Sequence, residues 1–269
     1  MKPYEGYLLC TDVDGTLVGG GNEISRENIQ AIKRFMDGGG IFTVATGRTP
    51  MIAATIFTDF LPNAPIAAHN GASVYDLAAK EYLHTAPLGD TAEELLMYVE
   101  ETFDCAGFEV YHYDDIYRRG TNDYIANYIG AERLPGAAFA EMPKPWTKAV
   151  LAQSEEDTAR IAEHLAASKY AGSYNFNKSG GILLEIMSVG ASKGAALLRI
   201  KEMLGAGIHT TIGMGDYEND ISMLRVCDVS YAVGNATDEV KRAARHVTVR
   251  HTEHAVAKVI EGISLRGIF

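Results

Sequence analysis

Short apolar runs alternate with longer segments of helical period in the amino-terminal part of the chain. Apolar runs typical of buried strands occupy residues 7–11, 41–45 and 66–68. Between the first two, Ile29, Ile32 and Met36 recur at the three- and four-residue spacing that gathers side chains on one face of a helix. This alternation predicts strand–helix–strand units and therefore an α/β fold with a parallel sheet.

Capping residues mark the ends of two expected helices. Ser25 can accept a hydrogen bond from the first turn of one helix, and the glycines at 38–40 end it. Thr49 followed by Pro50 is a favourable cap and first position for the next helix. The carboxyl ends of the expected strands then carry Asp12, Thr46 and His69-Asn70.

Residues 85–188 show a different pattern, in which the expected strands arrive in adjacent pairs. Strands are expected at residues 108–113, 116–118, 149–151, 172–177 and 182–187, and helices at 91–103, near 124–129 and after Ser154. Turn residues between neighbouring strands indicate antiparallel pairing. The sequence thus predicts an α+β unit of residues 85–188 inserted into an α/β domain made of residues 1–84 and 189–269.

The α/β alternation returns at Ser192. This residue can cap a helix with Leu197 and Ile200 on its apolar face. Residues 208–212 form another apolar run before Gly213-Met214-Gly215-Asp216, and a short helix is expected from Asn219. Two or three further units run to the end of the chain.

Charge and composition narrow the class of protein. The chain has 269 residues, 47% of them hydrophobic, with 35 acidic against 24 basic side chains and a formal net charge of −11. Clustered cations supply non-specific affinity for nucleic acids, so this balance argues against a nucleic-acid polymer as partner. No uncharged apolar stretch reaches the roughly 18 residues of a membrane span, and the amino end lacks a signal-peptide core, so we expect a cytoplasmic protein without a membrane partner.

The cysteines Cys10, Cys105 and Cys227 are odd in number and far apart in the sequence. Neither a disulfide framework nor a zinc site follows from such spacing. Each is expected to be a small buried apolar side chain.

Two carboxylates follow the first expected strand in Asp12-Val13-Asp14-Gly15-Thr16. Residues two apart in an extended segment point the same way, so Asp12 and Asp14 can address one ligand at the carboxyl edge of the sheet, where open α/β sheets bind ligands. Their mutual repulsion calls for a cation, and Mg²⁺ suits a site of few carboxylates plus water and phosphate. An Asp-rich turn bent at Gly15 explains this pentapeptide alone equally well.

A second acidic motif, residues 213–220, follows another strand of the buried type. It places Asp216 and Asp220 four residues apart, about one helical turn. Asn219 or Asp220 could instead serve only as a helix cap. Four carboxylates at two strand ends of one sheet are harder to explain by capping, and they favour a metal site.

Groups suited to phosphate accompany these carboxylates. Thr46-Gly47-Arg48 offers a hydroxyl and N–H groups at a strand-to-helix turn, although a helix cap would use the same atoms. Lys193, in the first turn of a helix, opposes the helix dipole unless an anion lies nearby. Taken alone it would be a surface lysine; beside the acidic motifs it is the cation that a phosphate and several carboxylates need.

In this order the motifs resemble those of the haloacid dehalogenase superfamily of phosphohydrolases, in particular its Cof-type (subfamily IIB) branch. The resemblance rests on residues 12–16, Thr46-Gly47-Arg48, Ser192-Lys193-Gly194 and residues 215–220. It extends to Asn70-Gly71-Ala72, Leu184-Glu185-Ile186 and Gly234-Asn235-Ala236. Before the last helix the chain departs from the pattern, because Glu253-His254 stands where relatives usually have an Asp-Gly pair.

The resemblance implies a Rossmann-like core with a parallel sheet and an inserted α+β cap of the C2B type. It implies that Asp12 attacks phosphorus to form an aspartyl-phosphate, while Asp14 acts as general acid and base. Mg²⁺ would be held by the Asp12 carboxylate, the Asp14 backbone carbonyl and Asp216, with Asp220 orienting a bound water. The phosphoryl oxygens would be bound by Thr46, Gly47, Lys193 and Asn219.

The remainder of the substrate would be recognised by polar residues near the site and on the cap. The candidates are Arg48, Asn70, Arg118, Lys178 and Ser179. For the cap residues a solvated surface position is the commoner role of such side chains.

The predicted function is that of a Mg²⁺-dependent phosphomonoesterase acting on a small phosphorylated metabolite, in particular a sugar phosphate. A phosphotransferase or phosphomutase of the phosphomannomutase kind would use the same Asp12, but the short spacing from Asp216 to Asp220 favours the hydrolase. A sensor that holds a phosphorylated ligand without catalysis is a third alternative. The protein is expected to be a monomer or a homodimer.

Overall fold

A computed structural model of the chain describes residues 2–19, 22–103, 107–127, 134–179 and 181–266. The chain folds into two compact units. The core unit comprises Met1–His84 and Ser192–Phe269, and the inserted unit comprises Thr85–Ala191. No helix in the described ranges is long and apolar enough to cross a membrane.

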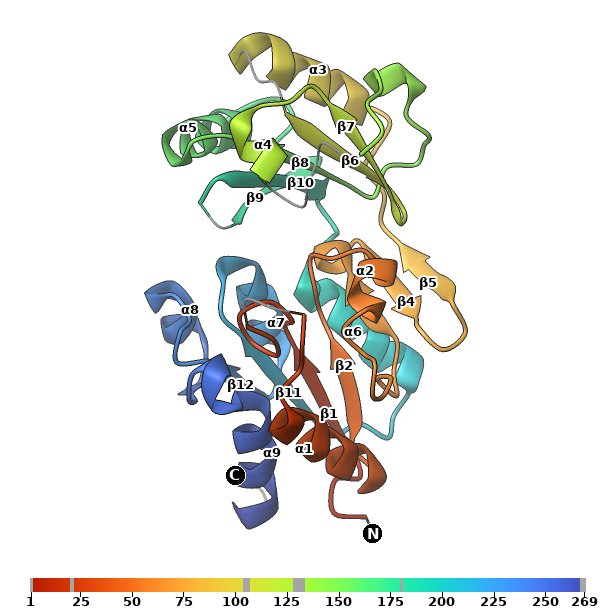
Figure 1. Ribbon diagram of the computed structural model, residues 1–269, viewed down its shortest axis with the longest axis vertical. Coiled ribbons are helices and arrows are strands. Elements are labelled where there is room, and N and C mark those ends of the chain that lie inside the picture. The colour runs from red at the N-terminus through yellow and green to blue at the C-terminus, as the bar shows by residue number, and fades with distance from the viewer. Residues whose placement is uncertain (1, 20–21, 104–106, 128–133, 180, 267–269) are drawn as a thin grey trace. The chain divides into compact units, whose positions relative to one another are not determined.

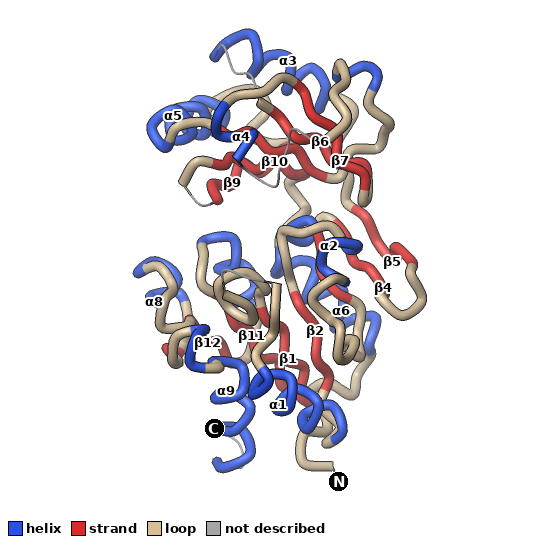
Figure 2. The backbone as a smooth tube through the Cα atoms, in the orientation of Figure 1, coloured by secondary structure: helices blue, strands red, loops and turns tan. Residues whose placement is uncertain are grey.

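The core unit contains a parallel five-stranded sheet in the order β13-β12-β11-β1-β2 (Figures 1 and 2). Its elements are β1 (Tyr7–Thr11), α1 (Arg26–Asp37), β2 (Ile41–Val44), α2 (Pro50–Ala54), β3 (Ile66–Ala68), η1 (His69–Gly71), β4 (Ser73–Asp76), β5 (Glu81–Thr85, which ends at the boundary with the inserted unit), α6 (Lys193–Leu204), β11 (Thr210–Gly215), η4 (Glu218–Asp220), α7 (Ile221–Val226), β12 (Val229–Ala232), α8 (Asp238–Ala243), β13 (His246–Val247), η5 (His251–Glu253) and α9 (Ala255–Arg266).

Strand β1 has no exposed face, because helices cover the sheet on both sides. Leu9 belongs to one apolar cluster with residues of α1 and α9, among them Phe35 and Ile260. Leu8 belongs to another cluster with residues of α6 and α7. Successive side chains of a strand point to opposite faces, so an uninterrupted apolar run is what such a doubly covered strand requires. The predicted α/β class with a parallel sheet is confirmed.

Caps fix the helices that follow the strands. The Ser25 hydroxyl accepts from the Asn28 N–H at 3.3 Å at the start of α1, and Thr49 accepts from the Ile52 N–H at 3.3 Å at the start of α2, where Pro50 is the first residue. Each cap satisfies one of the backbone N–H groups that a helix start leaves unpaired. Both expected caps are therefore present.

Three features of the core differ from the sequence-based expectations. Strand β3 joins β2 through a single bridge, Ala45 to Ala67, and pairs antiparallel with β4 in a separate three-stranded sheet, β3-β4-β5. The turn at His69–Gly71 reverses the chain and brings β4 back along β3. Strand β11 runs through Gly215 instead of ending at residue 212, and a short η4 precedes the helix expected from Asn219.

The inserted unit is an antiparallel five-stranded sheet in the order β7-β6-β8-β10-β9, with α3 and α5 on one face (Figure 1). Its elements are α3 (Ala92–Phe103), β6 (Phe108–His112), β7 (Asp115–Arg119), α4 (Asp123–Asn127), η3 (Phe139–Glu141), β8 (Lys148–Ala152), α5 (Glu155–Ala166), β9 (Tyr174–Ser179) and β10 (Leu183–Ser188). Every strand expected here is present, with bounds that differ from the expected ones by at most two residues. Cys105 and the end of the helix expected near 124–129 lie outside the described residues.

The two faces of the inserted sheet differ in polarity. Val110, Leu151 and Leu184 pack against α3 and α5 in one apolar cluster that includes Trp146. The register places Glu109, Tyr111, Lys148 and Glu185 together on the other face.

These four polar side chains are all buried. The Tyr111 hydroxyl donates to Glu109 Oε2 at 2.6 Å, and Lys148 Nζ lies 3.7 Å from Glu185 Oε1 and 4.8 Å from the Tyr111 ring centroid. Burial raises the pKa of Glu109, against the lowering effects of Tyr111 and Lys148.

Glu109 makes the stability of the inserted unit depend on pH. Because its pKa is raised on folding, its contribution to the unfolding free energy is largest below the ordinary carboxyl pKa and is lost as the pH rises through the raised value. Glu109→Gln keeps an oxygen acceptor for Tyr111, so it should stabilise the unit relative to wild type more at about pH 8 than at about pH 4.5.

Fluorescence of Trp146, the only tryptophan of the chain, reports unfolding of this unit during urea titration. Glu101→Gln, at an exposed position on α3, is the control and should change the free energy of unfolding by less than about 0.5 kcal/mol. Equal effects of Glu109→Gln at both pH values would contradict the prediction.

Candidate active site

Residues from several strand ends meet at the carboxyl edge of the core sheet. Asp12 follows β1 directly, Thr46 comes two residues after β2, and Asp216 follows β11. The register pairs Thr11 with Val44 on one side and with Met214 on the other, so the three strands end level with one another. Parallel strands thus bring residues far apart in the sequence to one edge.

The Lys193 ammonium lies between two buried carboxylates. Its Nζ donates to Asp12 Oδ1 and to Asp220 Oδ1, each at 2.6 Å. The three side chains are 1%, 7% and 0% exposed for Lys193, Asp12 and Asp220. Lys193 is the first residue of α6, whose N-cap is Ser192. The start of this helix therefore places the ammonium group at the strand ends.

Burial controls the protonation of this cluster. It raises the pKa of Asp12 well above its usual range, and the Lys193 ammonium only partly opposes this. Burial alone would lower the pKa of Lys193, but the carboxylates of Asp12 and Asp220 raise it above its ordinary value, so the lysine stays charged. One ammonium faces more than one carboxylate, and a further cation would favour the ionised form of Asp12.

Asp216 completes the acidic cluster. Its Oδ1 accepts from the Thr16 hydroxyl at 3.2 Å, and burial together with the Asp220 charge raises its pKa to about 6. Gly15, with φ +82°, passes so close that a Cβ there would collide with the Asp216 carboxylate. Glycine is therefore required at this turn both for its conformation and for its lack of a side chain.

The carboxylates of Asp12, Asp216 and Asp220 could hold a metal ion, since one oxygen of each lies within 4.8 Å of the others. Both oxygens of Asp220 already accept bonds within the protein: Oδ1 from Lys193, and Oδ2 from the backbone N–H groups of Asp216 and Tyr217 at 2.9 and 3.1 Å. Asp12 Oδ2, in contrast, is buried without a hydrogen-bond partner among the described residues. An all-oxygen donor set with an unsatisfied carboxylate oxygen fits a hard divalent cation such as Mg²⁺.

The Asp14 side chain lies in a different environment from that of Asp12. Its side chain is 56% exposed and accepts two bonds from Arg48, 2.6 and 2.9 Å long. Arg48 also donates to Asn22 Oδ1 at 3.0 Å. The guanidinium, anchored after β2, therefore holds the Asp14 carboxylate beside the strand ends.

The other expected phosphate-binding residues lie along the same edge. The Thr46 hydroxyl accepts from the Arg48 N–H at 3.1 Å, and Gly47 lies against the Asn70 carboxamide. Asn219 Nδ2 donates to Asn70 Oδ1 at 3.1 Å. Residues of the core unit singled out from the sequence are thus brought together.

The structure does not bring all the candidates in the inserted unit together. Arg118 lies on β7 at one edge of the sheet, whereas Lys178 and Ser179 lie on β9 at the opposite edge. Arg118 lines a cavity of about 490 Å³ with Arg119 and Thr121. Lys178 is exposed.

Sequence reasoning missed several supporting contacts. Asn235 Nδ2 donates to the Gly15 carbonyl at 2.8 Å, and the His251 N–H donates to Asn235 Oδ1 at 3.0 Å. The Ser222 hydroxyl accepts from the Gly194 N–H at 3.1 Å. Asn235 and Gly194 belong to segments on which the family resemblance rests, but the sequence shows neither their bonds nor their partners His251 and Ser222.

The departing pair Glu253-His254 has local partners. Glu253 Oε2 accepts from the Arg250 N–H at 3.1 Å, and His254, with φ +61°, places Nδ1 2.9 Å from the Ser25 hydroxyl. The His254 contact connects the loop to the start of α1.

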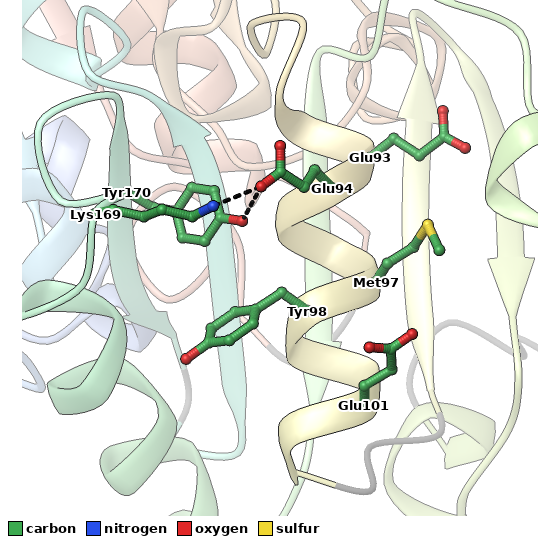
Figure 3. A pocket seen from close by; sticks show the side chains of 7 residues that line it. All are labelled: Glu93, Glu94, Met97, Tyr98, Glu101, Lys169 and Tyr170. Carbon is green, nitrogen blue, oxygen red and sulfur yellow. Dashed lines mark hydrogen bonds and ion pairs between the residues drawn. The ribbon is translucent and has the colours of Figure 1, made fainter.

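A separate cavity of about 540 Å³ lies on the inserted unit between α3 and the segment after α5 (Figure 3). Glu93, Glu94 and Glu101 contribute carboxylates, and the cation among its lining residues, Lys169, is paired with Glu94 at 2.6 Å. An excess of negative charge disfavours a phosphate ester here, so this cavity is not the candidate site.

Relatives of known name span almost the whole chain. The chain is 24% identical to 5-amino-6-(5-phospho-D-ribitylamino)uracil phosphatase YitU of Bacillus subtilis, over 95% of this chain and 96% of the relative. It is 25% identical to pyridoxal phosphate phosphatase YbhA of Escherichia coli, over 94% of this chain and 97% of the relative.

The fold agrees with solved structures. A haloacid dehalogenase-like hydrolase from Bacteroides thetaiotaomicron superposes with a TM-score of 0.79, covering 95% of this chain and 98% of the other at 24% identity. The shared fold class, a parallel core with an inserted antiparallel unit, is the one predicted from the sequence. The model of the family described as haloacid dehalogenase-like hydrolase matches residues 9–260. The chain therefore belongs to the haloacid dehalogenase-like hydrolase family of enzymes, as its motifs predicted.

Proposed function

We propose that this protein is a Mg²⁺-dependent phosphomonoesterase that acts through an aspartyl-phosphate on Asp12. The observation that carries the proposal is the Lys193 ammonium bound to both Asp12 and Asp220, with Asp216 in the same cluster. Buried like charges cost free energy unless opposite charges compensate them. A site of this composition therefore suits a ligand that carries both positive and negative charge, as Mg²⁺ with a phosphate does.

In the first step Asp12 is the nucleophile. A carboxylate oxygen attacks phosphorus, the bond between phosphorus and the ester oxygen breaks, and the leaving alkoxide takes a proton from Asp14. Asp14 is half exposed and held through its bonds to Arg48, so one of its oxygens must leave Arg48 and take up a proton before it can donate to the leaving group. The products are the aspartyl-phosphate and the free alcohol.

In the second step a water molecule attacks the phosphorus of the aspartyl-phosphate. Asp14, now a carboxylate, takes the proton of this water, and the bond between phosphorus and Asp12 breaks to release inorganic phosphate. Asp12 and Asp216 would hold Mg²⁺ together with the Asp14 carbonyl, and Asp220 would orient a bound water. When bound, the ion neutralises phosphoryl charge and favours the ionised form of Asp12.

Neutral and cationic donors of the core unit would bind the phosphoryl group. Lys193 supplies a fixed positive charge, and the Thr46 hydroxyl, the Gly47 N–H and the Asn219 amide supply hydrogen bonds. Preorganised donors of this kind stabilise the charge of a loose phosphoryl-transfer transition state without reorganising during the reaction.

The relatives and the inserted unit support a proposal for the substrate class. Both named relatives act on a small molecule that carries one phosphate ester, in one case on a ribityl chain. We assign the same class to this enzyme, with a sugar phosphate or sugar-alcohol phosphate as the first choice. The inserted unit would act as the cap that recognises the part of the substrate beyond the phosphate.

Replacing the nucleophile tests the mechanism. Asp12→Asn should lower phosphate release by at least about 10³-fold, because an amide cannot form the acyl-phosphate. Asp228→Asn is the matched control, since Asp228 bonds to Thr211 at the amino end of β11 and should keep activity. Release is measured with Mg²⁺ and with EDTA across sugar phosphates, nucleotides, pyridoxal phosphate and p-nitrophenyl phosphate.

An Asp12→Asn protein with wild-type turnover would contradict the mechanism. Transfer of the phosphoryl group to a second alcohol, without release of phosphate, would instead assign the enzyme to the phosphotransferases.

Binding of Mg²⁺ should stabilise the fold. At about 100 times its Kd the ion should add about 2.7 kcal/mol to the unfolding free energy, seen as a higher melting temperature. Asp216→Asn should lose most of this shift, whereas Asp228→Asn should keep it. The same shift in Asp216→Asn and in wild type would show that the ion binds elsewhere.

Lys193→Met should be strongly destabilising, because it leaves Asp12 and Asp220 buried without their cation. We expect a loss of about 3–5 kcal/mol in urea unfolding followed by circular dichroism. Adding Asp220→Asn should restore part of the loss, since one of the stranded charges is removed. Lys201→Met on the same helix should change stability by less than about 0.5 kcal/mol; an equally small effect of Lys193→Met would refute the electrostatic account.

A further inference from the structure

Three consecutive residues adopt left-handed backbone conformations between β3 and β4. The φ angles of His69, Asn70 and Gly71 are +51°, +54° and +94°. A positive φ costs of order 1 kcal/mol at a non-glycine residue and persists where surrounding contacts impose it. The contacts that impose it here involve three of the loops that form the candidate site.

The backbone of this segment holds the loop after β2 and the start of α6. The His69 N–H donates to the Arg48 carbonyl at 2.9 Å, and the Asn70 N–H donates to the Thr46 carbonyl at 2.8 Å. Gly71 approaches the Ser192 carbonyl so closely that a Cβ there would collide with it. The segment therefore fixes the positions of Thr46 and of the residue preceding Lys193.

The side chain of Asn70 reaches a third loop. It is 1% exposed, and its Oδ1 accepts from Asn219 Nδ2 at 3.1 Å. This is the only hydrogen bond of the Asn219 side chain within the described ranges, and Asn219 Oδ1 is buried there without a partner. Because the two N–H groups of a planar carboxamide diverge at a fixed angle, a bond from one to Asn70 sets the direction of the other.

We propose that Asn70 is a positioning residue that orients the Asn219 amide toward the phosphoryl group and, through its backbone, fixes Thr46. The inference rests on the proposed function, because the group to be oriented is the phosphate-binding donor. It assigns Asn70 a role that needs no contact with the substrate. Asparagine suits the position, since it tolerates a positive φ better than most residues and supplies the acceptor oxygen.

A double-mutant cycle tests the coupling. Asn70→Gly removes the carboxamide, while glycine readily keeps the left-handed backbone conformation. The variant therefore tests the role of the side chain apart from that of the backbone. We expect it to lower kcat/KM and the affinity for inorganic phosphate in the presence of Mg²⁺ by about tenfold. In an Asn219→Ala background the same change should have less than about a twofold effect, because the group that Asn70 positions is already gone.

A structural asparagine of the core unit serves as the control. Asn63 Oδ1 accepts from the Phe42 N–H at 2.7 Å and its Nδ2 donates to the Gly40 carbonyl at 3.0 Å, at the amino end of β2. Asn63→Ala should lower the melting temperature without changing kcat/KM or phosphate affinity.

Each outcome of the cycle is informative. Equal effects of Asn70→Gly in both backgrounds, or no effect in the wild-type background, would overturn the positioning role while leaving the phosphatase proposal intact. A wild-type protein that neither releases phosphate from any ester nor binds inorganic phosphate in calorimetry would overturn both.

Discussion

The ion pair network of Lys193 with Asp12 and Asp220 is the interaction on which the site depends. Carboxylates this deeply buried can stay ionised at one edge of a sheet only if a cation lies between them, and Lys193 does so with two contacts of 2.6 Å. The network is also incomplete, since Asp12 keeps a buried oxygen without a partner among the described residues. A cluster with more carboxylates than cations suits the binding of a metal ion together with a phosphate group.

The fold supplies this arrangement through parallel strands whose carboxyl ends lie level. Asp12 and Asp216 come from neighbouring strands although they are separated by most of the chain. This arrangement requires the backbone to pass close to neighbouring residues. Gly15 and Gly71 allow this at positions where a Cβ would collide with a neighbouring residue. The segment at His69–Gly71 then joins the loops after β2, before α6 and at Asn219, so the groups proposed to bind phosphate form one connected structure.

Much of this could be predicted from the sequence, because the signals were local. An apolar run predicted β1, Ser25 predicted the start of α1, and two acidic motifs after buried strands predicted the carboxylates that meet. Strands β4 and β5 were missed; β5 has two exposed and three half-buried positions and therefore lacks the apolar run of a buried strand. The bond between Asn70 and Asn219 joins residues 149 positions apart through a left-handed turn, and neither feature is visible in the order of residues.

The buried polar face of the inserted sheet could not be predicted from the sequence either. Glu109 and Lys148 are charged residues of the kind that usually lie on the surface, yet the register of three strands buries them beside Tyr111 and Glu185. The charge of a residue does not predict whether its face of the strand will be buried. The pairing of β6 with β8 joins two separate segments, so neither segment alone predicts it.

If Asp12 carries the phosphoryl group during turnover, rapid acid quenching of the enzyme with its best substrate labelled with ³²P should trap the labelled protein. Peptide mapping should find the label on the peptide that contains Asp12, in a form released by hydroxylamine, as expected of an acyl-phosphate. Turnover during which the protein carries no label, or carries it on another residue, would show that Asp12 is not the nucleophile.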